Sequence, residues 1–257
     1  MKILAIGDVV SPPGMEALRR LLRPAKKRYA ADFIIVNGEN CSGVGLTPRQ
    51  AEELFDAGAD LITLGNHAFK RPEIAPLLDE TDRILRPANL APQAPGRGWA
   101  IYDLGRARLL VMVLQGRCEM AFGPDNPFLA ADRILRDNRG QYDLAVCEFH
   151  AAATSEKLAL GFYLDGRLGA VYGTHTHVPT ADARVLPRGT GYITDIGMTG
   201  PVDSVLGVQP EQSIAMFRGD LAPRFRPADG PAAMMGVFVK LDPSSGRCAD
   251  IERFTME

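Results

Sequence analysis

Short apolar runs alternate with longer amphipathic stretches along most of the chain. The runs are rich in branched apolar residues, which is typical of buried β-strands. They lie at residues 3–6, 33–36, 61–64, 109–114, 144–147, 170–172, 192–194 and 237–241. An alternation of strand, helix and strand at this spacing predicts right-handed crossover connections and a largely parallel α/β fold.

Two of the intervening stretches carry clear helix signals. The first is predicted from Pro13 to Tyr29, with a kink or break at Pro24. The second begins at Thr47, a cap residue followed by proline, and ends at Gly58. Residues 218–236 are rich in Pro, Gly and Arg without a clear period, which predicts a long surface loop before a final hairpin-like pair of strands.

Polar side chains gather where the predicted strands end. Ligands of α/β sheets bind outside the carboxyl ends of the strands, so we expect these side chains to meet in one crevice. Glycines precede several of them, at Gly7, Gly38, Gly65 and Gly173, where a sharp turn is expected to need a positive φ. The polar residues are Asp8, Glu39, Asn40, Asn66, His67, His150, His175 and His177, and they include all four histidines of the chain.

Composition describes an ordinary globular protein. The 257 residues are 46% hydrophobic and 23% charged with a net charge of −2, which predicts one domain over residues 1–257. The slight acidity disfavours a nucleic-acid partner, so the basic residues between Arg19 and Arg28 are expected to form a solvated helix face. No run approaches the roughly 20 apolar residues of a membrane span, and no leader is expected before Asp8. A small-molecule partner and a cytoplasmic location are predicted, and a homo-oligomer stays open.

The cysteines do not suggest a thiolate metal site. The four of them show no Cys-x-x-Cys spacing, so buried or incidental thiols are expected. Cys41, next to Gly38-Glu39-Asn40, is the one candidate for an exposed and reactive thiolate.

The number of candidate ligands favours two metal ions. Three histidines with two carboxylates and two carboxamides exceed the three protein ligands of a usual catalytic zinc site. Glu39 could bridge two ions, and a mixture of imidazole and oxygen ligands suits iron or manganese, with zinc as a third candidate.

The order of these motifs resembles that of the calcineurin-like metallophosphoesterases. Gly38-Glu39-Asn40, Gly65-Asn66-His67, a lone His150 and Gly173-Thr174-His175-Thr176-His177 follow the superfamily order. Two differences point to a narrower branch: no histidine follows in Asp8-Val9-Val10, and Glu39 replaces an aspartate. With residues 149–157 and 194–200, the chain is similar to the YmdB-like family of 2′,3′-cyclic nucleotide phosphodiesterases. It differs from that branch at Glu148 and Ala152, which are expected to change the surroundings of His150 rather than the ligands.

The resemblance implies a fold and a role for each residue. The fold is a sandwich of two mixed β-sheets flanked by helices, with a dinuclear metal site at the carboxyl ends of the strands. One metal would be held by Asp8, Glu39, Asn40 and His177, and the other by Glu39, Asn66, His150 and His175. A hydroxide bridging the metals would open 2′,3′-cyclic nucleotides to 3′-nucleotides, with His67 as the proton donor.

Several alternatives stay open at this point. A mononuclear metallohydrolase of amides or lactones would need only the His-x-His pair. A non-catalytic regulator could use the same pocket to sense a nucleotide or to bind RNA. The loop Gly43-Val44-Gly45 lacks the end of a P-loop and is interpreted as a flexible turn. Asp182 and Asp195 are expected either to accept hydrogen bonds from ligand imidazoles or to be solvated loop acids.

Overall fold

The apolar runs fold into two stacked β-sheets in the computed structural model, which describes residues 1–120, 123–221 and 224–257. The first sheet has eight strands in the order β2 (Asp8–Val9), β12 (Met198–Pro201), β13 (Ala232–Leu241), β1 (Lys2–Ile6), β3 (Phe33–Asn37), β4 (Leu61–Thr63) and β5 (Ile84–Leu85), with β14 (Cys248–Met256) paired to β13. The second has six, in the order β10 (Arg184–Val185), β11 (Gly191–Ile193), β9 (Ala170–Thr174), β8 (Leu144–His150), β7 (Arg108–Gln115) and β6 (Trp99–Asp103).

Both sheets combine parallel and antiparallel pairs of strands. Strands β1, β3, β4 and β5 pair in parallel, as do β7, β8, β9 and β11. Strand β13 runs antiparallel to β1, β12 and β14, and β6 and β10 run antiparallel to their neighbours. The predicted crossover units are therefore present, but they are divided between two mixed sheets.

Alternating side chains along each strand divide the apolar core into three clusters. In β1, Ile3 and Ala5 pack between the two sheets, whereas Leu4 and Ile6 face the outer helices. In β7 the same alternation sends Val111 inward between the sheets and Met112 outward. Each sheet is thus buried on both faces, which explains why its strands are continuous apolar runs.

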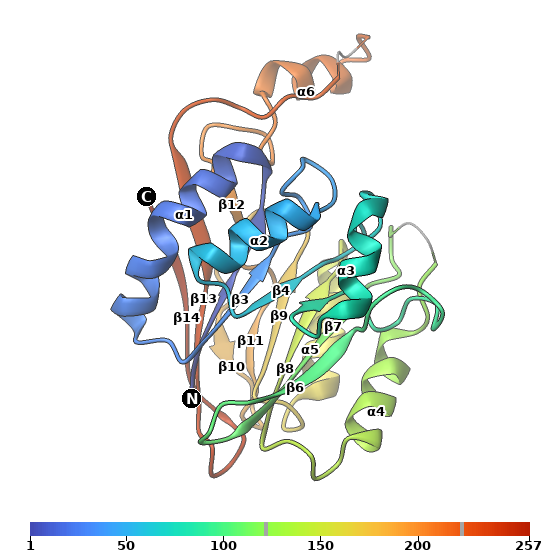
Figure 1. Cartoon of the computed structure of the whole chain (residues 1–257), viewed down its shortest axis with the longest axis vertical. Helices are drawn as coiled ribbons and strands as arrows, with labels where there is room; N and C mark the ends of the chain where they lie inside the picture. The colour runs from blue at the N-terminus through green and yellow to red at the C-terminus, as the bar shows by residue number, and fades with distance from the viewer. Residues whose placement is uncertain (121–122, 222–223) are drawn as a thin grey trace.

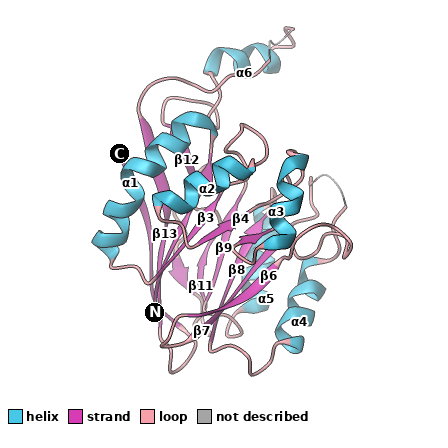
Figure 2. Cartoon of the chain, in the orientation of Figure 1, coloured by secondary structure: helices cyan, strands magenta, loops and turns pink. Residues whose placement is uncertain are grey.

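Helices cover the outer face of each sheet (Figures 1 and 2). The first sheet is covered by α1 (Ser11–Tyr29) and α2 (Pro48–Ala57), and the second by α4 (Pro127–Asp137) and α5 (Thr154–Leu164). A short 3₁₀ turn, η1 (Pro72–Ile74), precedes α3 (Ala75–Glu80). Helix α6 (Pro210–Phe217) stands away from the sheets, and Figure 1 shows it at the top of the molecule. Among the described residues, no helix is both long enough and apolar enough to cross a membrane.

Several local predictions can be compared with these elements. Thr47 and Gln50 form a capping box at the start of α2, and Gly58 ends that helix with a φ of 120°. The break predicted at Pro24 is wrong, because α1 continues through it to Tyr29. The loop predicted over 218–236 extends too far, since β13 begins at Ala232, and its residues 222 and 223 lie outside the described part of the chain. The final pair of strands is confirmed as β13 and β14. The two-residue strands β2, β5 and β10 are too short to give a periodic pattern.

Candidate metal centre

The carboxyl ends of five parallel strands bring the candidate side chains together. From the first sheet, Asp8 follows β1, Glu39 and Asn40 follow β3, and Asn66 and His67 follow β4. From the second sheet, His150 ends β8, and His175 and His177 follow β9. All eight predicted residues are thereby within one connected set of contacts. The predicted crevice lies where the ends of two sheets meet, rather than along one open sheet.

Three side chains converge on one nitrogen of His150. Its Nε2 lies 2.8 Å from Asn66 Oδ1, 3.1 Å from His175 Nδ1 and 3.1 Å from Glu39 Oε1. Ligand atoms of Glu39, His150 and His175 all lie within 4.8 Å of one another. These four residues are the set that the resemblance assigned to the second metal, and their donors are close enough to share one ion.

The set assigned to the first metal lies beside it. His177 Nε2 is 3.6 Å from Asp8 Oδ1, and the Asn40 Nδ2 atom lies 3.2 Å from His177 Nε2 and 3.3 Å from Asp8 Oδ1. Asn40 thus turns its amide nitrogen toward the other two residues, and its oxygen toward His67. A half-turn of the amide exchanges the two atoms and would present the oxygen to an ion.

His67 is the most accessible of the histidines that contact Glu39. Its side chain is 23% exposed, whereas that of His150 is fully buried. Its Nδ1 lies 2.8 Å from Asn40 Oδ1, and its backbone N–H donates to Glu39 Oε2. Burial lowers the pKa of His67 from its usual value, while the Glu39 carboxylate acts in the opposite direction. The ring is held next to the candidate ligands but opens toward solvent.

The buried carboxylates make the site a strong attractor of cations. Glu39 Oε1 is completely buried and, among the described residues, accepts no well-directed hydrogen bond. Burial alone would lower the pKa of His150, yet the carboxylates of Glu39 and Asp8 outweigh it and raise that pKa to about 9. Burial lowers the pKa of His175 to about 4, with His150 acting in the same direction. A buried carboxylate oxygen that accepts no well-directed hydrogen bond and lies among imidazole nitrogens fits a transition-metal ion, which would supply positive charge.

A buried hydrogen-bond chain fixes the ring of His150. Its Nδ1 lies 2.9 Å from Thr174 Oγ1, and the Thr174 hydroxyl donates to Glu148 Oε1 at 3.0 Å. Glu148 also accepts from Asn37 Nδ2, while Asn37 Oδ1 accepts the backbone N–H of Glu39. Burial raises the pKa of Glu148 to about 7. With Nδ1 facing Thr174, the other ring nitrogen points at the ligand cluster, the arrangement found around metal-binding histidines.

The His-x-His turn is held in an uncommon backbone conformation by a buried ion pair. His175 and His177 have φ angles of 98° and 65°, which non-glycine residues seldom adopt. Lys157 Nζ donates to Asp195 Oδ2 at 2.7 Å and to the carbonyl of Thr174 at 2.8 Å. The same carboxylate oxygen accepts the backbone N–H and the hydroxyl of Thr176. The sequence interpretation gave Lys157 no role, because a lysine in a helix is ordinarily solvated.

Among the described residues, neither acid proposed to support the ligands makes a hydrogen bond to an imidazole. Asp195 accepts from Lys157 and Thr176 instead, and Asp182 accepts from the hydroxyls of Thr180 and Thr194. The alternative of a solvated loop acid is wrong for Asp195, which is fully buried, whereas Asp182 is only partly buried. The residues that do orient His150, Thr174 and Glu148, lie next to motif residues in the sequence.

Close backbone approach explains the four glycines, and the predicted positive φ is wrong for each of them. None of Gly7, Gly38, Gly65 and Gly173 has a positive φ. A Cβ on Gly65 would lie 2.3 Å from His150 Cδ2, and one on Gly173 would lie 1.8 Å from the carbonyl oxygen of Thr194. Gly65 therefore allows the end of β4 to approach His150 of the other sheet, and Gly173 allows close approach within its own sheet.

Three other predictions concern the neighbourhood of the site. Cys41 is fully buried and burial raises the pKa of its thiol, so the exposed thiolate is wrong. The Gly43–Gly45 segment is a hydrogen-bonded turn, in which Gly45 N donates to the carbonyl of Glu39 at 2.6 Å. On α1, Arg19 pairs with Glu16 and Glu53, which fits a solvated helix face.

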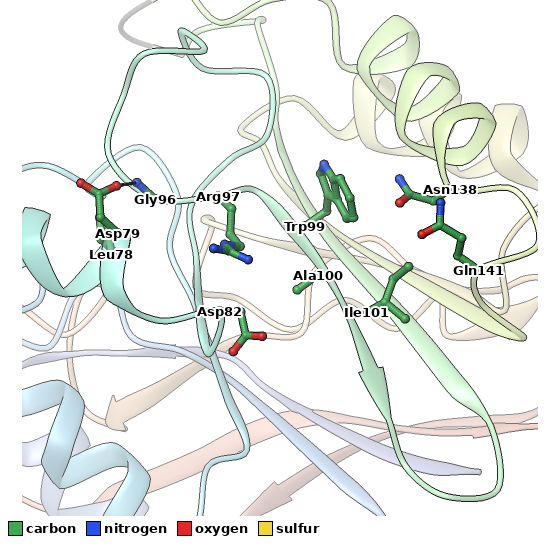
Figure 3. Close-up of a pocket in the computed structure, with 10 residues that line it drawn as sticks. All are labelled: Leu78, Asp79, Asp82, Gly96, Arg97, Trp99, Ala100, Ile101, Asn138 and Gln141. Atoms are coloured by element: carbon green, nitrogen blue, oxygen red, sulfur yellow. Dashed lines mark hydrogen bonds between the residues drawn. The ribbon is translucent and has the colours of Figure 1, made fainter.

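A hollow elsewhere on the surface does not include the candidate ligands. It has a volume of about 510 Å³ and lies between the α3 segment and strand β6. Figure 3 shows Trp99 and Ile101 of β6 on one side of it, facing Asn138 and Gln141, with Arg97 and Asp82 on the other. None of the four histidines lines it.

Comparison with known proteins shows the family of this chain. The family model described as YmdB-like protein matches residues 4–254. A 2′,3′-cyclic-nucleotide 2′-phosphodiesterase of Bacillus subtilis is 44% identical over 256 residues, which cover 98% of this chain and 96% of that protein. The chain belongs to the YmdB-like family. The family resemblance drawn from the motifs is confirmed.

Two solved structures support the YmdB-like fold. A hypothetical protein from Thermus thermophilus is similar with a TM-score of 0.92 and 42% identity, covering 100% of this chain and 99% of that chain. A phosphatase from Mycoplasma pneumoniae is similar with a TM-score of 0.94 and 33% identity, covering 100% and 93%. The predicted sandwich of two mixed sheets flanked by helices, as in calcineurin-like metallophosphoesterases, is likewise confirmed.

Proposed function

We propose that this YmdB-like protein is a dinuclear metal-dependent phosphodiesterase that opens 2′,3′-cyclic nucleotides to 3′-nucleotides. The observation that carries the proposal is the convergence of Glu39 Oε1, Asn66 Oδ1 and His175 Nδ1 on His150 Nε2, at 2.8–3.1 Å. The activity named for the Bacillus subtilis relative supports the choice of substrate. The bond that is broken is then the one between phosphorus and O2′, because the product keeps its phosphate on O3′.

Each residue has a place in this reaction. Asn66, His150 and His175 would hold one metal, Asp8, Asn40 and His177 the other, and Glu39 both. When bound, the two ions supply activation of the attacking water and neutralise charge on the phosphoryl oxygens. The mixed nitrogen and oxygen set favours iron or manganese, with zinc as a third candidate.

His67 is suited to protonate the leaving oxygen. Its Nδ1 faces the Asn40 carboxamide, so that Nε2 is the ring nitrogen left to deliver a proton to O2′. Its partial exposure allows the ring to reprotonate from solvent after each turnover. General acid catalysis of this kind contributes about 10²- to 10⁴-fold.

The proposal is tested by a hydrolysis panel on protein whose metal content is measured in the same preparation. The substrates are 2′,3′-cyclic and 3′,5′-cyclic nucleotides and bis-p-nitrophenyl phosphate. We expect two metals per chain and a preference for the 2′,3′-cyclic substrates. One tightly bound metal would favour a mononuclear hydrolase, and tight nucleotide binding without turnover in metal-loaded, reduced protein would favour a regulator.

Variants separate the roles of the ligands and the acid. Asp8→Asn or Glu39→Gln should lose metal and activity together, because each removes a buried anionic donor. His67→Gln should retain both metals and lose turnover by about 10²-fold or more. Full activity of His67→Gln would refute its role as the acid. One domain over residues 1–257, a location in the cytoplasm and a possible homo-oligomer stay predictions beside this function.

A further inference from the structure

An apolar hollow adjoins the candidate metal centre. Its volume is about 400 Å³, within the range of small-molecule sites. One wall is the segment after β4, which contributes Asn66, Ala68 and Phe69, and the opposite wall is the segment after β5, which contributes Leu90 and Ala91. Asn66 belongs to both features, since its Oδ1 faces His150 while the residue lines the hollow. A molecule bound at the metals can therefore extend directly into this space.

The lining of the hollow suits a flat apolar ring. Phe69 is 37% exposed and lines the hollow, so it offers aromatic surface to a ligand there. The alanines at 68, 91 and 94 leave width for a planar group. Lys70 also lines the hollow and adds a positive charge. Aromatic side chains bind nucleobases by stacking, which tolerates every base because each has a π-face.

The second wall is preformed by buried hydrogen bonds. The Arg86 guanidinium donates to the carbonyls of Pro87, Ala94, Pro95 and Gly96, and so holds the segment after β5 in one shape. Asn89 donates to the carbonyl of Gln115 and accepts its backbone N–H, which ties the segment to the end of β7. A wall fixed before binding loses little conformational entropy when a ligand enters.

We propose that this hollow, the base pocket, holds the nucleobase of the cyclic nucleotide, with the ring stacked on Phe69. The proposal rests on the proposed function and adds the subsite that binds the part of the substrate remote from the reaction. Contact is through stacking and apolar surface rather than through the edges of the base. The four 2′,3′-cyclic nucleotides should therefore be hydrolysed with kcat/KM values within about tenfold of one another.

The test compares a substrate with a base and one without it. The two are 2′,3′-cyclic AMP and the 2′,3′-cyclic phosphate of methyl riboside. Phe69→Ala should lower kcat/KM for the nucleotide about 5- to 150-fold, mostly through KM, and leave the baseless substrate within about twofold. Ala91→Trp, which fills the pocket, should discriminate in the same direction. Phe162→Ala is the matched control, since Phe162 is 50% exposed on α5 and does not line the pocket.

The outcomes separate this inference from the proposed function. Equal loss on both substrates, or no loss on either, in variants with wild-type metal content would overturn the base pocket alone. Failure of the metal-loaded wild type to hydrolyse any cyclic nucleotide would overturn the proposed function and the pocket with it. A kcat/KM more than about 100-fold higher for one base than for the others would indicate recognition of the edge of the base instead of stacking. That result would also refute the proposal.

Discussion

The buried ion pair between Lys157 and Asp195 gives the sharpest test of how the site is held. Lys157 is 1% exposed and Asp195 is 0% exposed, and their side chains are 2.7 Å apart. Lys157→Met keeps most of the side-chain volume but leaves the Asp195 carboxylate buried without its cation. Breaking a buried pair in this way costs about 3–5 kcal/mol. We expect the free energy of unfolding to fall by that amount.

A double-mutant cycle separates the cost of a buried charge without its partner from the cost of lost packing. In Lys157→Met/Asp195→Asn no charge is left behind, while the amide oxygen can still accept from Thr176. The double variant should therefore lose about 1–3 kcal/mol less than the sum of the two single variants. The measurement is urea-induced unfolding followed by circular dichroism, with chelator present so that metal binding does not contribute. Lys27→Met, at an exposed position of α1, is the control and should change stability by less than about 0.5 kcal/mol.

The same variant also tests whether the pair supports the histidine turn. Lys157 Nζ and Asp195 Oδ2 both bind the segment Thr174–Thr176, from which His175 and His177 extend at positive φ. Without the pair, the turn should relax toward ordinary backbone angles, and metal affinity should fall at temperatures where the protein is still folded. A destabilisation under about 1 kcal/mol, additive single variants, or unchanged metal affinity would refute the reasoning.

Three further predictions concern single contacts. Gly65→Ala should displace the His150 ring, because the new Cβ would lie 2.3 Å from its Cδ2, and mass spectrometry of the metals should find fewer than two per chain; wild-type content would contradict this. Thr174→Val removes the bond to His150 Nδ1 and should weaken metal binding about 10- to 100-fold in a chelator competition, with Thr174→Ser as the control. The pKa of Asp182 is lowered: burial alone would raise it, but hydrogen bonds from Thr180 and Thr194 outweigh burial. The ionised Asp182 carboxylate therefore contributes to the free energy of unfolding above the unfolded pKa of about 4, and this contribution is lost as the pH falls through the lower folded pKa. The difference in free energy of unfolding between wild type and Asp182→Asn should become smaller on acidification. A difference that does not change with pH would exclude this linkage.

Whether a strand could be predicted from the sequence depended on its length. Runs such as 109–114 and 144–147 are apolar at every position because both faces of their sheets are covered, and all of them became strands. Strands of two residues, such as β2 and β5, exist because a longer neighbour supplies their hydrogen bonds, so their own sequence gives no period. The division of the parallel strands between two sheets is likewise invisible to periodicity. It was predicted only through the family resemblance.

Side chains at strand ends were predictable because their positions along the sequence and in space coincide. The residues that position them were not, since their roles depend on burial by distant segments. Lys157 becomes buried only when α5 packs on the second sheet, 38 residues before its partner Asp195. Thr174 was visible within Gly173-Thr174-His175, but nothing in the sequence distinguishes a threonine that orients His150 from one that fills a strand.

The positive φ angles of His175 and His177 show how much the site depends on the residues that position its ligands. A sparsely populated backbone conformation costs a non-glycine residue about 1–3 kcal/mol, and both His175 and His177 adopt one. Glycine at these positions would relieve the strain but could not bind a metal, so contacts around the turn have to offset the strain. Lys157 and Asp195 supply the charge-assisted hydrogen bonds at the first half of the turn, and the Leu206 carbonyl, 3.3 Å from His177 Nδ1, lies at the second. The four glycines act in the opposite way, because each leaves out a side chain where neighbouring atoms leave no room for one. Turn chemistry alone predicts positive φ angles at glycines and ordinary angles at histidines. Here the two histidines have the positive φ angles, and the four glycines do not. This difference arises because eight polar side chains from the ends of two sheets have to meet in one site.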